Sequence, residues 1–540
     1  MLLTCLKSYD KSQFIKDVTA GIIVAIIALP LSIALALASG VGPEAGIFTA
    51  IVAGFVISAL GGSCVQIAGP TAAFATIVAG IVARDGMDGL IIATIMAGIF
   101  LILMGLFHFG SLIKFIPYTI TTGFTSGIAV TIVIGQLKDF FGVTYPDGVK
   151  PNETTEKMKA FVQNISSINI DALIVGVVSL AILIIAPYVL KKVPGSLIAV
   201  IVGILMVQFL PLKVSTIGNL YTISNSLPSF HMPAIRFSTI SASVSNAFTI
   251  AVLAAIESLL SCVVADGMIN SKHRSDMELV AQGAGNIASA LFGGIPATGA
   301  IARTAANIKN GGRTPIAGMV HSVTLIIVLV VLMPYAGMIP MPTIAAILFI
   351  VAYNMCQWRT FRDLVKTAPK SDILVLIVTF VLTVIFDLVV AIEIGMVLAC
   401  LLFIKRMSEE THADSWVYTD DDTPDIDEHL QKLPLQIRVY EITGPLFFGA
   451  ADAIEHIVVK DFTSCLVLRM RGVPALDSTA MNALQNLVKT CEGKGITLVF
   501  SHVNEQPMHV MEKAGFVELV GKENFQSNIS AALKRAEEVI

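Results

Sequence analysis

The stretch that decides the fold is "GGIPATGAIART", which spans residues 293–304. Long apolar segments flank it on both sides. The stretch itself is too short and too rich in Gly and Pro to cross a bilayer, because a full span takes about 20 apolar residues. It also carries an arginine, Arg303. Irregular backbone at membrane depth is tolerated only where it lines a cavity or is buried in protein, so this stretch predicts a binding site.

A second stretch of the same kind occurs earlier in the chain. "QIAGPTAAFA", residues 66–75, also places a proline, small residues and a threonine at the start of a short apolar segment. The spacing supports a duplication, because Pro30 lies 41 residues before Thr71 and Glu257 lies 41 residues before Thr298. Gly/Pro-interrupted segments at matching positions in two halves are typical of a transporter binding site.

The composition is that of a membrane protein. Of the 540 residues, 55% are hydrophobic and 14% are charged, whereas soluble proteins carry about 25% charged residues. Residues 1–408 predict a polytopic α-helical transmembrane domain with fourteen segments, built as two repeats at about 15–211 and 240–406. The two short stretches take the third and tenth places. The segments are 19–37, 45–60, 69–83, 88–107, 117–137, 170–187, 196–211, 246–264, 279–292, 298–308, 314–333, 341–354, 372–386 and 387–404.

The basic residues predict the orientation of these segments. If the N-terminus is cytoplasmic, the inner loops hold sixteen Lys and Arg residues and the outer loops hold seven. Positive residues are enriched on the cytoplasmic side of membranes. We therefore expect a multi-pass protein of the cell membrane with both termini in the cytoplasm. The first apolar segment runs on too far for a cleaved signal peptide.

Two facing half-helices predict an anion site. The free N–H groups and the positive dipole end of each helix would point to the bilayer midplane, where they attract a negative group. Thr71 and Thr298 stand at these ends. Each hydroxyl has two open interpretations, because it caps its helix or it touches the ligand. Arg303 either adds positive potential or pairs with Glu257.

Glu257 is a carboxylate deep inside the apolar run "TIAVLAAIESLLSCVVADG". Ionisable residues inside a membrane are costly and commonly mark ion or proton sites. Ser261 lies one turn on, on the same helix face, and a carboxylate with a hydroxyl suits Na⁺ coordination or a proton relay. The alternative is a structural carboxylate. We expect a scaffold role for Glu393 and a hydrogen-bonded interior position for His321.

Residues 407–540 form a separate acidic module, with 11 Lys and Arg residues against 21 Asp and Glu residues. Residues 409–434 predict an acidic linker. Three strand-like and three helix-like runs within 435–540 predict one small α/β domain. Asp477 and Ser478 directly precede a helix-like run. N-capping is the expected role there, and the sharper hypothesis is phosphorylation of Ser478 at the helix start.

Several classes of function lack support in the sequence. Seven scattered cysteines offer no disulfide framework and no zinc spacing. We therefore expect no cofactor, and no metal apart from Na⁺ at Glu257 and Ser261. No nucleophile–base arrangement or phosphate-binding loop points to an enzyme, and nothing points to nucleic-acid binding.

Four stretches together resemble the SulP (sulfate permease) family of anion transporters, along essentially the whole chain. They are "ALPLSIALALASGVGPEAGIFTA", "IAGPTAAFA", "IPATGAIARTAANIKNGGRTP" and "RMRGVPALDSTAMNAL", of which the last resembles the family's C-terminal STAS domain. The resemblance implies a seven-plus-seven inverted repeat of the uracil-permease kind, with core and gate domains, a cytoplasmic STAS domain over residues 435–540, and a homodimer. We expect the STAS domain to bind a regulatory protein or a nucleotide.

The resemblance also assigns site residues. It places the substrate between the third and tenth segments, at positions that act through hydroxyls and backbone amides: Thr71, Ala72, Thr298 and Gly299. Arg303 matches an arginine of the family's tenth segment.

The sequence departs from the family at this site. Ala302 stands where many members have a serine, and Leu31 and Leu35 stand where many have a glutamine and an aromatic residue. Fewer polar side chains are therefore available to contact the anion, which leaves more of the binding to backbone and threonine hydroxyls. The stretches "LPLSIALALASGVGPEAG" and "AGPTAAF" most resemble the branch of the family that contains the cyanobacterial sodium–bicarbonate symporter. The sodium site of that symporter uses an aspartate and a threonine four residues further along the chain. Glu257 and Ser261 replace that pair, which leaves Na⁺ and H⁺ both open.

We therefore expect a secondary-active transporter of a small anion, bicarbonate or sulfate, coupled to Na⁺ or H⁺ through Glu257. Two alternatives within transport stay open. One is C4-dicarboxylate/H⁺ symport, and the other is anion exchange or uncoupled conduction with a structural Glu257. A different class is a membrane-bound sensor that signals through its STAS domain.

Overall fold

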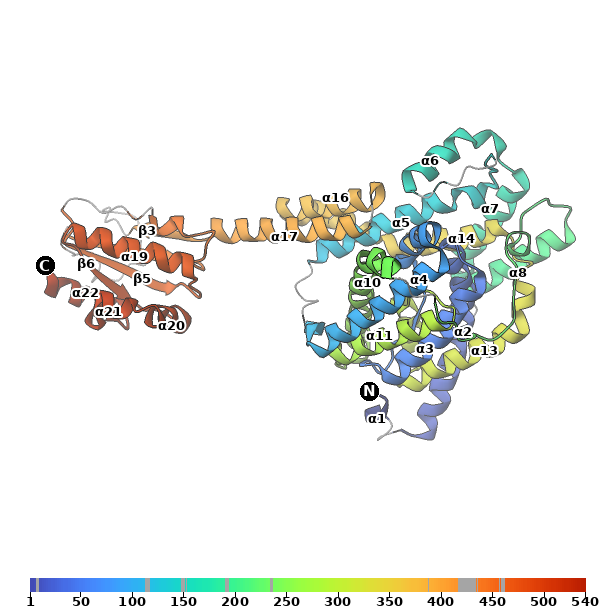
Figure 1. Ribbon diagram of the computed structural model, residues 1–540, viewed down its shortest axis with the longest axis horizontal. Coiled ribbons are helices and arrows are strands. Elements are labelled where there is room, and N and C mark those ends of the chain that lie inside the picture. The colour runs from blue at the N-terminus through green and yellow to red at the C-terminus, as the bar shows by residue number, and fades with distance from the viewer. Residues whose placement is uncertain are drawn as a thin grey trace. The chain divides into compact units, whose positions relative to one another are not determined.

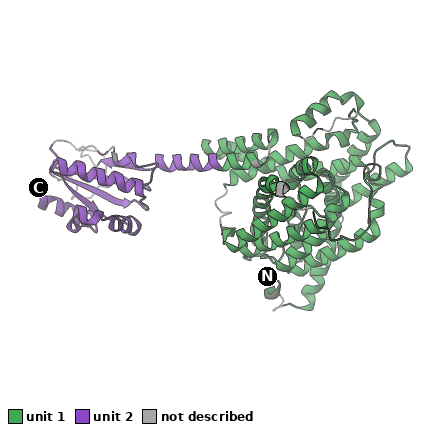
Figure 2. Ribbon diagram, viewed as in Figure 1, with its two compact units in different colours: residues 1–396 green, residues 397–540 purple. Residues whose placement is uncertain are grey.

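The structure is a computed structural model of the chain. It describes all residues except 6–8, 112–116, 147–150, 152, 190–193, 234–236, 387, 416–433, 435, 456 and 458–461. The chain divides into two compact units, residues 1–396 and 397–540 (Figure 2). Each unit has its own hydrophobic core.

The first unit is helical apart from two short strands (Figure 1). Each predicted apolar segment coincides with a helix or with part of one, and eight helices of the described chain are long and apolar enough to cross a membrane. The main helices are α2 (Lys11–Ala38), α3 (Pro43–Leu60), α4 (Ala75–Leu106), α5 (Tyr118–Phe141), α7 (Ile170–Val189), α8 (Gly195–Phe209), α10 (Phe237–Ile269), α11 (Ser275–Leu291), α12 (Ile301–Lys309), α13 (Pro315–Ala336), α14 (Met341–Cys356), α16 (Lys370–Ile385) and α17 (Leu388–Glu409).

Shorter elements connect these helices. They are α1 (Leu2–Cys5), β1 (Ala68–Gly69), η2 (Ala72–Phe74), α6 (Thr154–Gln163), η4 (Ile165–Ser167), α9 (Ile217–Leu220), β2 (Thr298–Gly299) and α15 (Trp358–Thr367). The predicted third and fourth segments join into α4, which is broken at Gly86. The φ of 70° and ψ of −169° at Gly86 are non-helical, and glycine adopts such a conformation at little cost. The helix before Gly86 is therefore the first predicted half-helix.

The helices of the first unit form two groups. α2, α3, α4, α10, α11, α12 and α13 pack mainly against one another, and α5, α7, α8, α14 and α16 form the second group. Each group draws helices from both predicted repeats. This mixing is what an inverted-repeat fold with a core and a gate requires, because each half of the chain contributes to both bundles.

The second unit is an α/β domain with the sheet order β3-β4-β5-β6-β7. β4 (Ile437–Thr443), β5 (Cys465–Gly472), β6 (Thr497–Ser501) and β7 (Phe525–Gln526) run parallel. Side chains alternate between the faces of a strand, so β5 sends Leu466 and Leu468 to one core and Cys465 and Val467 to the other. The flanking helices are α18 (Asp452–Glu455), α19 (Ser478–Gly493), α20 (Glu505–Lys513), α21 (Phe516–Val520), η6 (Lys522–Asn524) and α22 (Ile529–Val539).

Residues 409–434 are predicted to form a linker, but the first part of this range contains a strand. Residues His412–Ser415 form β3, which pairs antiparallel with β4. Its burial alternates between exposed and half-buried, so its residues carry no apolar pattern that would mark a strand. The rest of that linker, 416–433, lies outside the described residues.

Candidate functional site

The two half-helices start from one shared ladder. β1 and β2 pair antiparallel, with Gly69 opposite Thr298 and Ala68 opposite Gly299. Beyond the ladder, the Ala300 N–H donates to the Ile67 carbonyl at 2.9 Å. η2 and α4 follow β1 almost directly, and α12 follows β2. The starts of both helices therefore lie beside this ladder, and the first N–H groups of a helix have no partner within the helix.

The Thr71 hydroxyl links the predicted anion site to the predicted coupling residue. Its Oγ1 donates to Oε2 of Glu257 on α10, with 2.9 Å between the two atoms. Thr71 precedes η2, but its side chain makes no capping hydrogen bond. Both side chains are half-buried. The structure thus assigns the hydroxyl to Glu257 and not to the cap.

Thr298 and Ser261 are fully buried and hold the ladder against α10. Oγ1 of Thr298 donates to the Ala254 carbonyl of α10 at 3.0 Å. Oγ of Ser261 donates to Oγ1 of Thr304 at 3.4 Å, and the same Thr304 oxygen accepts the Ile67 N–H at 3.0 Å. Ser261 therefore contacts α12 in this conformation, although it shares a helix face with the predicted coupling carboxylate.

Arg303 lies behind the start of the first half-helix and is 4% exposed. Its Nη2 donates to the Pro70 carbonyl at 3.2 Å and to Oγ of Ser32 at 3.5 Å. The structure does not show the alternative pairing with Glu257 in the part of the chain it describes. Nη1 has no partner among the described atoms. It would lie 2.5 Å from a Cβ at Gly69, so a side chain at position 69 would have to displace this end of the guanidinium.

His321 differs from its expectation. It is an interior residue of α13, with no exposed surface. Neither ring nitrogen, however, has a hydrogen-bond partner among the described residues. The prediction of a hydrogen-bonded interior histidine is therefore right about its position and wrong about its bonding. Glu393, predicted to be part of the scaffold, is exposed on α17.

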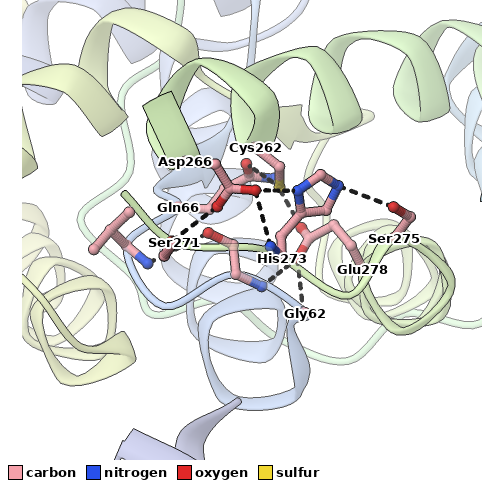
Figure 3. A network of polar contacts seen from close by, with 10 residues as sticks. Gly62, Gln66, Cys262, Asp266, Ser271, His273, Ser275 and Glu278 are labelled. Carbon is pink, nitrogen blue, oxygen red and sulfur yellow. Dashed lines mark hydrogen bonds and ion pairs between the residues drawn. The ribbon is translucent and has the colours of Figure 1, made fainter. Parts of the chain in front are cut away.

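Glu278 at the start of α11 is a buried carboxylate that sequence patterns do not single out. Its Oε2 accepts the N–H groups of Gly62 at 2.8 Å and Ser63 at 3.2 Å. Its Oε1 accepts Nε2 of Gln66 at 2.8 Å and Nε2 of Gln282 at 2.9 Å. Figure 3 shows the contacts of the Glu278 carboxylate with Gly62 and Gln66. The segment that leads into β1 is therefore fixed on α11.

The same helix fixes the segment that leads into β2. Nδ2 of Asn286 donates to the Ala297 carbonyl at 2.9 Å, and the Ala297 N–H donates back to Oδ1 at 2.8 Å. Oγ of Ser289 donates to the Ile295 carbonyl at 2.8 Å. One helix thus braces both half-helix starts. The sequence shows only that polar residues recur every three or four positions, at 278, 282, 286 and 289, which places them on one helix face. The burial of that face is seen only in the structure.

In the second unit, Asp477 caps α19 as predicted. Its Oδ1 accepts the N–H groups of Thr479 and Ala480, each at 2.9 Å. Its Oδ2 accepts the N–H of Phe448 at 2.8 Å, which also ties the cap to the neighbouring loop. Ser478 is the exposed first residue of the helix. Phosphorylation of Ser478 stays a prediction.

Comparison with known families decides the class of the protein. The Sulfate permease family profile matches residues 14–379, and the STAS domain profile matches residues 432–532. The chain belongs to the sulfate permease family. Transport and not catalysis is therefore its class of activity, and the apolar helices of the first unit make it a multi-pass membrane protein.

Relatives of this family member include two bacterial transporters. YvdB of Bacillus subtilis (strain 168), whose name assigns it provisionally to sulfate transport, is 39% identical over 526 residues, which cover 96% of this chain and 97% of YvdB. The bicarbonate transporter BicA of Picosynechococcus sp. is 31% identical over 538 residues, which cover 96% of this chain and 94% of BicA. The family of this chain thus includes proteins named for sulfate transport and for bicarbonate transport.

A solved structure shows the same fold. The murine Solute Carrier 26 family member A9 anion transporter, in its inward-facing state, superposes with a TM-score of 0.89 over 99% of this chain and 94% of that chain. The two sequences are 18% identical. The predicted fold class, a helical membrane domain of this family with a C-terminal STAS domain, is thereby confirmed.

Proposed function

We propose that this family member is a secondary-active symporter that moves a small oxyanion, bicarbonate or sulfate, together with Na⁺ or H⁺. The observation that carries the proposal is the hydrogen bond from Thr71 to Glu257. It joins the start of an anion-attracting half-helix to a carboxylate that H⁺ or Na⁺ can neutralise. The substrate class follows the names of the two relatives, a sulfate transporter and a bicarbonate transporter.

Coupling follows from charge and from the direction of one hydrogen bond. While Glu257 is ionised, it draws the Thr71 proton towards itself and repels a nearby anion. Binding of H⁺ or Na⁺ removes the repulsion. A protonated Glu257 can also donate to Oγ1 of Thr71, which frees the Thr71 O–H to donate to the anion. Cation and anion then raise each other's affinity by the same factor.

Backbone supplies most of the anion site in this proposal. The anion lies against the N–H groups at the starts of η2 and α12, with Ala72 and Gly299 as neighbours. Thr298 contributes through its backbone, because its hydroxyl is bonded to α10. Arg303 adds positive potential from behind Pro70, which its guanidinium contacts. Ile301, the first residue of α12, is 41% exposed.

Uptake into proteoliposomes tests the proposal. Labelled sulfate or bicarbonate is supplied under an imposed Na⁺ or H⁺ gradient, to the wild type, Glu257→Gln and the control Glu393→Gln, which removes an exposed carboxylate from another apolar helix. We expect concentrative uptake by the wild type and the control. Glu257→Gln is expected to keep anion counterflow and to lose the response to the gradient. An unchanged gradient response in Glu257→Gln would overturn the coupling role, and competition by excess succinate would favour a dicarboxylate substrate.

We further infer a homodimer in the cell membrane with both termini in the cytoplasm. The basic inner loops support this orientation. The STAS domain would then meet a cytoplasmic regulatory protein or nucleotide, and Ser478 would be open to a kinase. Mass photometry of the purified protein tests the dimer, and protease protection of the termini in sealed vesicles tests the orientation.

A further inference from the structure

Two cysteines that are far apart in the sequence meet at the N-terminus of the first unit. Sγ of Cys5, in α1, lies 2.9 Å from Sγ of Cys64, which follows α3. A second contact holds α1 at the same place, because the N-terminal amine of Met1 donates to the Gly61 carbonyl at 3.0 Å. Both cysteines are half-buried, and neither belongs to the site described above. The pair is therefore placed by two separate contacts between α1 and one loop.

The loop that carries Cys64 is fixed from its other side. The N–H groups of Gly62 and Ser63 and the side chain of Gln66 all donate to the buried Glu278. Cys64 is thus held between braced neighbours, while Cys5 stands at the end of a helix of four residues. A disulfide bond has a sulfur–sulfur distance of about 2.05 Å, which leaves about 0.9 Å of approach. The short α1 can supply that movement without shifting the loop.

We propose that Cys5 and Cys64 form a reversible disulfide that staples α1 to the loop leading into the first half-helix. The site is a redox modification site, independent of the proposed transport function. In a reducing cytoplasm the two thiols stay reduced, and a peroxide is the class of oxidant that joins them. The disulfide would then form only under oxidising conditions and would link α1 to the loop.

The chemistry balances with one peroxide. The thiolate of one cysteine attacks the O–O bond of hydrogen peroxide, which gives a sulfenic acid and, after proton transfer, one water. The second sulfur attacks the sulfenic sulfur, forms the S–S bond and releases a second water. Two thiols lose two electrons to the peroxide, and a dithiol reverses the reaction. Burial raises the pKa of Cys64 to about 12, so its thiolate is a minor form at neutral pH.

Mass spectrometry of the full-length protein tests the proposal. The purified protein is treated with hydrogen peroxide, blocked with N-ethylmaleimide, digested without reductant and searched for a peptide that links Cys5 to Cys64. We expect two of the seven thiols to disappear and the linked peptide to form, and dithiothreitol to restore both thiols. Cys5→Ser and Cys64→Ser should each abolish the link, whereas Cys400→Ser should keep it.

Two results would overturn the proposal. One is oxidation of Cys5 or Cys64 to the sulfinic acid in the wild type without any linked peptide. This result needs no variant to fold. The other is a link between different molecules, which a mixture of equal amounts of isotope-labelled and unlabelled protein reveals as mixed-mass linked peptides. A link found only within one isotope class supports the staple.

Discussion

The Thr71 hydroxyl and the Glu257 carboxylate share one hydrogen bond, 2.9 Å long, although they belong to different halves of the membrane unit. Thr71 stands at the start of the first half-helix, and Glu257 lies on α10, the first long helix of the second repeat. A residue expected to bind the anion is thus in direct contact with a residue expected to bind the cation. A change of charge on Glu257 must therefore alter the hydrogen bonding of Thr71.

The first prediction concerns the hydroxyl of Thr71. Thr71→Val keeps the shape of the side chain and removes the donor, whereas Thr71→Ser keeps the donor. A hydrogen bond to a charged group contributes about 1.5–3 kcal/mol, so we expect Thr71→Val to raise the KM for anion uptake about 10- to 100-fold. Thr71→Ser should stay within a few-fold of the wild type.

Thr76, in α4 and five residues after Thr71, offers a matched control. Its Oγ1 has no hydrogen-bond partner among the described residues, so Thr76→Val should leave the KM unchanged. An equal loss in Thr71→Val and Thr76→Val would assign the effect to helix packing and would contradict a ligand role for Thr71.

The second prediction concerns the four donors that converge on Glu278. Two N–H donors point to each oxygen of Glu278. Glu278→Gln keeps only one of these oxygens, so at least one pair of donors faces an NH₂ group. Each buried polar group without a partner costs about 1–3 kcal/mol. We expect a lower midpoint of thermal unfolding, measured by intrinsic fluorescence. Adding Gln66→Glu should recover part of the loss, because a carboxylate at position 66 accepts from the amide introduced at position 278. It also still accepts from the Cys262 thiol, as the Gln66 amide oxygen does.

Glu44→Gln is the control for this swap. Oε2 of Glu44 is buried, with no hydrogen-bond partner among the described residues, so its removal should change the unfolding midpoint little. The double variant could instead be less stable than Glu278→Gln alone. A carboxylate at position 66 would then not replace the one at position 278, which would contradict the role of Glu278 in fixing the segment before β1.

The third prediction separates two roles of Arg303. Arg303→Lys keeps the positive charge but loses the planar fork that reaches Pro70 and Ser32. Arg303→Met loses both. If Arg303 adds positive potential, Lys should keep the KM for the anion within a few-fold of the wild type and Met should raise it at least about 10-fold. Equal KM values for Lys and Met, together with equal loss of thermal stability, would mark a purely structural role.

The fourth prediction concerns pH and the buried thiols of the second unit. Burial raises the pKa of Cys465 to about 12 and that of Cys491 to about 11. Because the folded pKa lies above the unfolded value of about 8.5, both groups stabilise the fold below pH 8.5, and this contribution is lost as the pH rises towards 11–12. Alkylation by iodoacetamide at pH 8 should therefore be slow in the native protein and fast in urea. Equal native and denatured rates would contradict the burial.

Much of the fold can be predicted from the sequence, because hydrophobic segments and their breaks are local signals. The two half-helices follow from Pro70 and Pro296 with their small neighbours, and the break in α4 falls between the predicted third and fourth segments, at Gly86. The pairing of β1 with β2 does not follow, because strands of two residues have no periodicity to read.

The site was less predictable where a partner comes from another helix. The sequence singles out Thr71 by its place at the start of a half-helix and Glu257 by its place inside an apolar segment. Their hydrogen bond depends on how α10 packs, which no local sequence pattern specifies. Glu278 falls just before the predicted segment 279–292, so its burial is not expected. Arg303 has a carbonyl and a hydroxyl as partners, where charge alone suggests a carboxylate.

The most direct test of the central claim measures anion affinity against cation concentration. Binding of sulfate and of bicarbonate to the purified protein is followed by calorimetry across a series of Na⁺ concentrations and of pH values, for the wild type and Glu257→Gln. The account predicts that the wild-type affinity rises with Na⁺ or with falling pH, and that Glu257→Gln shows no such dependence. A wild-type affinity that responds to neither cation, or a full response in Glu257→Gln, would contradict it.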